Sequence, residues 1–226
     1  QISLIDNFFS YGKAFKKILH LHKIKKNNIY NIETIFLKNS KNNLRKSYDA
    51  CLFSYSPYPF NLDVTWDRQI ITELQVLKVF DDLGFKNILI KLKNSSPEKK
   101  KTEIKEIEIY KKIYEKIYKK KLKFNITISN KNFSDILSTP KLIVGGLSTA
   151  IIEANKLTDY YLYEPAMNGY SEYEFNSIKA FNKNYINKDP KSLLKSIEQK
   201  NVLKLKKDVF NKDISFSGTI DLINAK

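Results

Sequence analysis

The chain has 226 residues and a mass of 26.5 kDa, and 42% of its residues are hydrophobic, so it can bury a sizeable core and is not expected to be disordered. No apolar run reaches the ~20 residues that cross a bilayer, and a single cysteine, Cys51, excludes a disulfide framework and indicates a reducing compartment. The 40 lysines and arginines against 24 acidic residues give a formal net charge of +16, a field that attracts polyanions such as nucleic acid, anionic lipid and phosphorylated substrates.

The first 46 residues are expected to be the remnant of an N-terminal domain and a linker. Their apolar residues predict a helix around Phe8–Leu19 and a short strand at Ile32–Leu37, while the polar stretch Lys38–Lys46 is typical of a linker. The chain begins at Gln1 and not at a methionine, as expected of a piece of a longer protein or of a chain whose start is missing.

Residues 47–226 are predicted to form a second domain, in which short apolar runs alternate with longer amphipathic segments. The apolar runs predict five strands, at Tyr48–Tyr55, Asn87–Leu92, Leu122–Ile128, Lys141–Gly145 and Asp159–Tyr163. Helices are expected at Asp67–Leu83, Pro97–Lys120, Asn132–Leu137, Thr149–Leu157, Asp189–Gln199 and Asn201–Asn211. Continuous apolar strands that alternate with helices indicate parallel strands covered on both faces. The predicted fold class is therefore α/β, a Rossmann-like doubly wound parallel sheet.

The loop after Val144 carries the most informative candidate site. Ligands of an open parallel sheet bind outside the carboxyl ends of the strands, where the strand order reverses. Here Gly145 and Gly146 permit a sharp turn, and Ser148 and Thr149 then begin a helix. Backbone amides, two hydroxyl groups and the positive end of the helix dipole form an anion site suited to phosphate.

The structural alternative for this loop is that Ser148 only caps the helix. Glu153 is not explained by capping, because a capping box needs its acidic or amide residue at position 151, which is Ile151. Thr149 and Glu153 are four residues apart and share a helix face, so the carboxylate is placed to bind a ribose diol. The loop is neither a dinucleotide fingerprint nor a P-loop.

Other candidates follow the ends of neighbouring strands. Lys91 and Lys93 could neutralise a donor phosphate or form a solvated pair. The loop after the first strand and the tip of the last strand contribute six more positions that would face the cleft or the nucleotide: Ser54, Tyr55, Ser56, Tyr163, Glu164 and Pro165. Packing of the tyrosine after the first strand and a structural cap by Glu164 remain the alternatives. His20 and His22 are the only histidines, and no metal site is expected.

The segment Gly145–Ala154 (GGLSTAIIEA), followed by Tyr160–Pro165 (YYLYEP), resembles the nucleotide-sugar half of GT-B fold glycosyltransferases. The resemblance is to bacterial enzymes of capsule and lipopolysaccharide synthesis, including Kdo- and sialic-acid-type transferases, and covers about residues 48–225. It implies that Ser148 and Thr149 bind the donor phosphate and that Glu153 contacts the ribose. The segment Ile88–Asn94 is similar to the apolar-Lys-x-His-Pro segment of the family, with Lys-Asn where His-Pro is usual.

The resemblance implies the C-terminal, donor-binding domain of a glycosyltransferase. The reaction would transfer a sugar from a CMP- or UDP-linked donor to a hydroxyl group of a surface glycan or lipid-linked acceptor, with no metal or other cofactor. The general base of this fold usually comes from the other domain, so the catalytic residue is left unassigned. Two alternatives stay open: a UDP-sugar 2-epimerase, which shares the two-domain architecture, and a basic non-catalytic module that binds RNA or an anionic membrane.

The charge also predicts the surroundings of the protein. Arginine, which nucleic-acid readers use for bidentate contacts, occurs only as Arg45 and Arg68, so no specific nucleic-acid partner is expected. The sequence predicts a cytoplasmic protein in peripheral contact with the anionic inner face of the membrane.

Overall fold

The computed structural model of the protein describes residues 8–11, 29–32, 47–54, 66–92, 100–129, 136–137, 139–146, 154–155, 157–165 and 182–204. The chain divides into two compact units. One comprises Gln1–Asn39, Met167–Lys183 and Lys204–Lys226, and the other comprises Ser40–Ala166 and Asn184–Leu203. The division at residue 46 stays a prediction, and the two units are described separately below.

The first unit contains a two-stranded parallel sheet formed by β1 (Phe8–Tyr11) and β2 (Ile29–Ile32). The helix expected around Phe8–Leu19 is wrong at its start, because the aromatic run of β1 adopts an extended backbone and pairs with β2. The rest of that expected helix lies outside the described residues. The strand expected at Ile32–Leu37 begins earlier than predicted, and only Ile32 of the observed strand belongs to the expected range.

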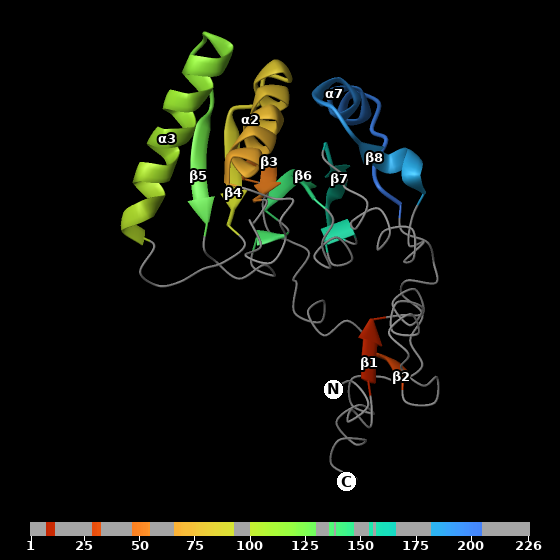
Figure 1. Cartoon of the computed structure of the whole chain (residues 1–226). Coiled ribbons are helices and arrows are strands. Elements are labelled where there is room, and N and C mark those ends of the chain that lie inside the picture. Colours follow the sequence, from red (N-terminus) through yellow and green to blue (C-terminus); the bar gives the residue numbers. More distant parts are fainter. Residues whose placement is uncertain are drawn as a thin grey trace. The chain divides into compact units, whose positions relative to one another are not determined.

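The second unit contains a six-stranded sheet in which each neighbouring pair of strands is parallel. The strands are β3 (Tyr48–Phe53), β4 (Asn87–Lys91), β5 (Asn125–Ser129), β6 (Pro140–Gly145), β7 (Asp159–Tyr163) and β8 (Ile186–Asn187). Their order in the sheet is β5-β4-β3-β6-β7-β8 (Figure 1). The prediction of a Rossmann-like parallel α/β sheet is confirmed.

Three of the described helices pack against this sheet: α2 (Trp66–Asp82), α3 (Lys100–Tyr118) and α7 (Pro190–Glu198). Helix α2 contacts β3 and lies between α3 and α7, both of which it contacts (Figure 1). A short 3-10 helix, Lys183–Tyr185, precedes β8. Helix α7 matches its predicted range because Asp189 caps it in a capping box with Ser192, and Pro190 begins its first turn.

The core lies between the sheet and these helices. Alternate residues of each strand point into it, among them Leu52, Ile90 and Val144, and α2 contributes Leu74, Leu77 and Phe80. The residues between them on the strands are also buried, as Cys51, Leu89, Ile143 and Leu162 show. Both faces of the sheet are therefore covered, as the continuous apolar strands predicted.

Apart from shifts at the ends of elements, such as the start of β5 at Asn125 and not at Leu122, two features of this unit differ from the sequence prediction. Strand β8 was not foreseen, because two residues are too short for a periodicity signal. The helix expected at Asn201–Asn211 is wrong at residues 201–204, which are not helical, and its remainder lies outside the described residues. Leu203 instead pairs with β7, where its amide donates a 3.0 Å hydrogen bond to the carbonyl of Tyr160.

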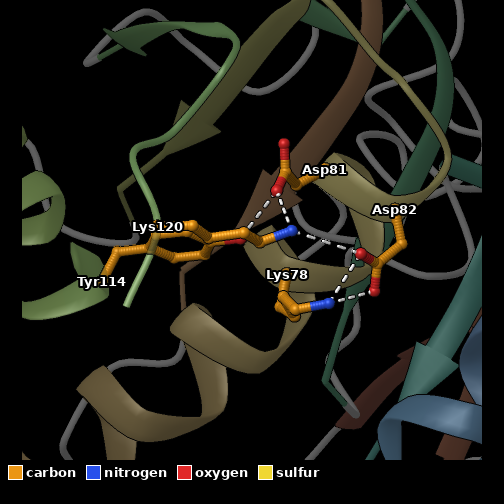
Figure 2. A network of polar contacts seen from close by, with 5 residues as sticks. All are labelled: Lys78, Asp81, Asp82, Tyr114 and Lys120. Carbon is orange, nitrogen blue, oxygen red and sulfur yellow. Dashed lines mark hydrogen bonds and ion pairs between the residues drawn. The ribbon is translucent and has the colours of Figure 1, made fainter. Parts of the chain in front are cut away.

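A network of polar side chains joins α2 to the end of α3 (Figure 2). Asp81 accepts a 3.0 Å hydrogen bond from the hydroxyl group of Tyr114 and lies 2.6 Å from the ammonium group of Lys120. Asp82 pairs with Lys78 one turn earlier and lies 3.5 Å from Lys120. Burial alone raises the pKa of Asp81, but Lys120 and Tyr114 outweigh it and hold that pKa below its ordinary value.

Candidate functional site

The strand order reverses between β3 and β6. From β3 the chain proceeds outward to β4 and β5 and then returns to β6, on the other side of β3, before continuing to β7 and β8. Leu52 of β3 pairs with Val144 of β6 in register, so the two strands end side by side. The residues that follow, Ser54 on one strand and Gly145–Gly146 on the other, lie at the reversal point, where open parallel sheets bind ligands.

Gly145 and Gly146, at the end of β6, are packed closely against Tyr160 and Phe53. The hydroxyl group of Tyr160, on β7, donates a 2.9 Å hydrogen bond to the carbonyl oxygen of Gly146. A Cβ atom at Gly145 would lie 2.5 Å from that hydroxyl oxygen and 2.9 Å from Cβ of Phe53. Glycine is therefore required at position 145 by the space available. The sharp turn that the sequence indicated does not begin at Gly145, which still belongs to β6 and pairs with Leu162.

The chain after this turn re-enters the described structure at the end of the predicted helix. Ala154 is helical and fully buried, and its carbonyl accepts a 2.9 Å hydrogen bond from the amide of Thr158. Asn155 donates a 2.5 Å hydrogen bond from its side chain to the carbonyl of Leu203. The segment that contains the predicted phosphate and ribose ligands is thus anchored at both ends by described residues.

Six of the predicted site residues lie outside the described residues: Tyr55, Ser56, Lys93, Ser148, Thr149 and Glu153. Their contacts with a ligand stay predictions.

Lys91 ends β4, opposite Phe53 of β3. Its ammonium group donates a 2.7 Å hydrogen bond to the carbonyl of Leu92, and the side chain is partly buried. Burial lowers the pKa of Lys91, although the neighbouring Cys51 acts in the opposite direction. Lys91 thus lies at the carboxyl edge, one strand away from the reversal point.

Ser54 faces α2, within a buried polar cluster that the sequence did not reveal. Its hydroxyl group donates a 2.7 Å hydrogen bond to Glu73 and accepts a 3.1 Å bond from the side chain of Gln69. Gln69 also donates a 3.0 Å bond to Glu73, and the hydroxyl group of Tyr110, from α3, donates to the other oxygen of this carboxylate. We call these residues (Ser54, Gln69, Glu73 and Tyr110) the Glu73 cluster.

The Glu73 cluster links Ser54, the residue directly after β3, to helices α2 and α3. Glu73 is fully buried, and a carboxylate is retained in the interior only when hydrogen bonds replace its water. The sequence contained a signal for it, since Glu73 lies within the apolar stripe of its helix, directly before Leu74 and one turn after Gln69. A charged residue on a buried helix face indicates a hydrogen-bonded network.

The tip of β7 holds the remaining predicted residues. Tyr163 is fully buried and donates a 2.6 Å hydrogen bond from its hydroxyl group to Gln75 of α2. Glu164 and Pro165 follow at the carboxyl edge and are partly buried. The amide of Glu164 donates a 2.9 Å bond to the carbonyl of Asn187, which extends the pairing of β7 with β8. The structure therefore brings the polar residues of this tip to the edge and turns the ring of Tyr163 toward the core.

Cys51 and the acidic residues offer no metal centre in the described part of the chain. Burial raises the pKa of Cys51, so the thiol keeps its proton. Among the described residues, no group of three His, Cys, Asp or Glu side chains could hold a metal ion. The described helices likewise include none with the length and apolar character needed to cross a membrane.

Comparisons with known proteins identify the fold in which this site lies. No protein-family model and no curated protein matches the chain. A solved structure of the UDP-GlcNAc 2-epimerase of Methanocaldococcus jannaschii, in complex with UDP-GlcNAc and UDP, matches 98% of this chain and 61% of its own, with a TM-score of 0.57 and 16% identity. A second structure of that enzyme matches 98% of this chain and 62% of its own, with a TM-score of 0.51 and 15% identity.

These matches show the fold of the chain. Its six-stranded parallel sheet resembles half of the GT-B-type fold of the UDP-GlcNAc 2-epimerases. The chain spans less than two thirds of the length of the two solved structures that it matches. The predicted half of a GT-B-type fold is thus shared with the UDP-GlcNAc 2-epimerase structures.

Proposed function

We propose that the six-stranded sheet binds a nucleotide sugar at its carboxyl edge. One observation carries the proposal: the strand order reverses between β3 and β6, and Gly145, which ends β6, and Gly146 lie at that point. Gly146 has no side chain and so lets a ligand approach the backbone closely, and the helix predicted after it supplies free amides for an anion.

The ligand contacts follow from the order of residues after the turn. Ser148 and Thr149 bind the diphosphate of the ligand, and Glu153, one helical turn later, accepts hydrogen bonds from the ribose hydroxyl groups. Lys91 and Lys93 balance the phosphate charge from the end of β4. The tip of β7 lines the base side of the nucleotide through Glu164 and Pro165, and the loop after β3 lines the sugar side through Tyr55 and Ser56. The side chains of Ser54 and Tyr163 are turned inward to Glu73 and Gln75, so they position these loops and do not touch the ligand.

For the reaction, the likeness to solved structures supports a UDP-sugar 2-epimerase. Two structures of such an enzyme match nearly the whole chain with TM-scores above 0.5, and one of them is a complex with UDP-GlcNAc and UDP. The reaction inverts the configuration at C2 of the sugar, and its acid and base groups would have to flank that carbon. We assign no residue of this chain to either role.

A glycosyltransferase is the second candidate, and the loop sequence favours it. The segments Gly145–Ala154 and Tyr160–Pro165 resemble the donor-binding half of bacterial capsule and lipopolysaccharide transferases. The protein would then stabilise the departing nucleotide while an acceptor hydroxyl group attacks the sugar. The two reactions share the nucleotide site and differ in whether an acceptor is needed.

Calorimetric titration of the chain with UDP, CMP, GDP and UDP-GlcNAc tests the proposed site. We expect one nucleotide to bind in preference to the others, and the double variant Ser148→Ala/Thr149→Ala to lose that binding by at least about tenfold, since two hydrogen bonds to a charged group are removed. Equal heats for all nucleotides, or an unaffected double variant, would overturn the proposal.

The two reactions are then separated by product analysis. With UDP-GlcNAc alone, an epimerase yields the 2-epimer of the sugar nucleotide, which NMR of the anomeric and C2 protons detects. A transferase leaves the donor unchanged until a glycan or lipid-linked acceptor is added, and then releases the nucleotide. Epimer formation without an acceptor favours the first reaction, and acceptor-dependent nucleotide release favours the second.

A further inference from the structure

Lysines concentrate where α3 ends. The segment Lys116–Lys123, which we call the polybasic turn, carries lysine at positions 116, 119, 120, 121 and 123. It comprises the last residues of α3 and the connection to β5. The backbone at Lys119 is left-handed, with φ of 55°, which ends the helix sharply and directs the connection back toward the sheet.

Most of this charge is not neutralised by ion pairs among the described residues. Lys120 is paired with Asp81 and Asp82 (Figure 2). The other four lysines of the polybasic turn are exposed, and in the described part of the chain none of them forms an ion pair: Lys116, Lys119, Lys121 and Lys123. Lys123 helps to lower the pKa of Asp81, and together the four ammonium groups within eight residues produce a local positive field that attracts an anionic surface.

Exposed isoleucines lie beside these lysines. Ile109 and Ile117 of α3 are 48% and 50% exposed. Helical spacing places Ile109 next to Lys112 and Lys116, three and seven residues further on, along one flank of the helix. Glu108 lies four residues before Lys112 and Glu115 three residues after it, so acidic side chains border this flank at Lys112 and not at Lys116. One flank of α3 therefore combines apolar side chains with positive charge.

This flank and the polybasic turn are far from the proposed nucleotide site. Helix α3 follows the carboxyl end of β4 and ends where β5 begins, so the polybasic turn lies at the amino edge of the sheet (Figure 1). The Gly145–Gly146 turn lies at the opposite, carboxyl edge. A partner could cover the polybasic turn without covering the nucleotide.

We propose that the polybasic turn, with Ile109 and Ile117, docks the protein on an anionic lipid surface. Lysines attract the headgroups, and the two isoleucines enter the boundary between headgroups and acyl chains. RNA is the less suitable polyanion, because single strands are held by stacking on exposed aromatic rings. The rings of this region are turned inward: Tyr114 is fully buried, and Tyr118 packs against it with ring centroids 4.7 Å apart. The docked protein keeps its carboxyl edge directed away from the membrane.

Vesicle co-sedimentation with the whole chain tests this docking. The probes are vesicles of phosphatidylcholine alone and of phosphatidylcholine mixed with phosphatidylglycerol. The test variant is Lys116→Gln/Lys119→Asn/Lys121→Gln/Lys123→Gln, with asparagine at position 119 because it tolerates a left-handed backbone. We expect binding to the mixed vesicles only, and a loss of about a hundredfold or more in the variant, as removal of four lysines near an anionic surface predicts.

A matched control removes the same charge elsewhere. The variant Lys191→Gln/Lys195→Gln/Lys200→Asn/Lys204→Gln neutralises four exposed lysines of α7 and the residues after it, including one with a φ of 53°. Both variants are checked for unchanged circular dichroism and thermal unfolding. The proposal is supported when the control retains vesicle binding. Equal loss in both variants would show that net charge alone is responsible, and absence of binding by the unmodified chain would equally overturn the proposal.

A second variant distinguishes lipid from RNA. Ile109→Ser/Ile117→Ser keeps every charge and removes the apolar side chains that enter the lipid. We expect it to weaken binding to the mixed vesicles severalfold and to leave any binding of a homopolymeric RNA unchanged. Vesicle binding that is unaffected by this variant, or that RNA displaces at equal phosphate concentration, contradicts the proposal in favour of a nucleic acid. Nucleotide titration of all three variants is expected to be unchanged, so this docking and the proposed function succeed or fail separately.

Discussion

The hydroxyl group of Tyr160 donates a hydrogen bond to the carbonyl oxygen of Gly146, which joins the middle of the sheet to the first residue after β6. Tyr160 is fully buried, and burial raises its pKa far above the ordinary value, so the hydroxyl group remains a donor throughout the physiological range. A rigid strand thus holds the start of the proposed phosphate loop in place.

Removal of this hydroxyl group, in Tyr160→Phe, is expected to weaken nucleotide binding more than it weakens the fold. The ring still fills its space, and the lost hydrogen bond lowers the free energy of unfolding by about 1 kcal/mol. The Gly146 carbonyl is then free to rotate, and we expect nucleotide affinity to fall by about fivefold, the equivalent of ~1 kcal/mol. Calorimetry and urea unfolding measure the two effects.

Tyr114→Phe is the control for that variant. It removes a tyrosine hydroxyl group that donates to Asp81, at the amino edge of the sheet. A similar loss of stability is expected with no change in nucleotide affinity. The interpretation of Tyr160 as a positioning residue fails when the two variants bind nucleotide equally.

Gly145→Ala is expected to destabilise the protein and to disturb the proposed site. The added methyl group would meet the hydroxyl oxygen of Tyr160 at 2.5 Å and Cβ of Phe53 at 2.9 Å, and neither strand can move away freely. Overpacking of this kind costs about 1–3 kcal/mol. Thermal unfolding should show the loss, and nucleotide affinity should fall because the turn is displaced.

Gly84→Ala provides the comparison for the glycine turn. Gly84 has a φ of +72°, but a Cβ atom there would have no neighbour within 4 Å. The cost is backbone strain of about 1 kcal/mol, and the position is far from the carboxyl edge. Loss of nucleotide affinity in Gly84→Ala to the same extent as in Gly145→Ala would mean that the effect is one of general stability.

Glu73→Gln tests whether the Glu73 cluster positions the loop after β3. The amide group presents hydrogen atoms where Ser54, Gln69 or Tyr110 now donates, and a buried donor left without an acceptor costs about 1–3 kcal/mol. We expect lower stability together with weaker nucleotide binding. Asp81→Asn breaks a comparable link between α2 and α3 at the amino edge and should reduce stability alone.

The stability of the protein is expected to fall at acidic pH through Asp49 and Asp81. A hydrogen bond from Lys141, with two from backbone amides, lowers the pKa of Asp49 below its ordinary value of 3.8, although partial burial opposes the shift. The pKa of Asp81 is lowered too, since Lys120 and Tyr114 outweigh its burial. Because both carboxyl groups release their protons more readily in the folded state, their contribution is complete above pH 3.8 and disappears as the pH falls through the lowered values.

Urea unfolding at a series of pH values measures this contribution. We expect the difference in unfolding free energy between the unmodified chain and Asp49→Asn to be largest at neutral pH, at about 1 kcal/mol or less, because Lys141, the partner of Asp49 in the ion pair, is largely exposed. The difference should shrink toward zero in strong acid. A difference that stays constant across the series would show that Asp49 acts through packing and not through its charge.

The sequence predicted the sheet well because its strands are continuous apolar runs. Val144 and Ile90 are fully buried, and runs of this kind read as strands covered on both faces. The helix predicted at Asp189–Gln199 was also found, and the structure shows Asp189 as its cap and Pro190 in its first turn. Strand β8 lacked such a signal because it has only two residues. Its position depends on contacts with β7, among them the hydrogen bond that the side chain of Asn187 donates to the carbonyl of Leu162.

The candidate site was predictable in its location and less so in its internal contacts. The glycine pair after Val144 and the rule for open parallel sheets indicated the carboxyl edge. The inward orientation of Ser54 depends on Glu73, nineteen residues later, and that of Tyr163 on Gln75. Such pairings form only when a helix packs on a strand, so the residues near each of them in the chain give no indication of the partner.

The most direct test of the central claim is hydrogen–deuterium exchange of the whole chain with and without saturating UDP-GlcNAc. The account predicts slower exchange in peptides that cover residues 145–155, after β6, and residues 53–56, after β3, with no change in the polybasic turn at the amino edge. Protection confined to the polybasic turn, or no protection anywhere at saturating ligand, would contradict nucleotide-sugar binding at the point where the strand order reverses.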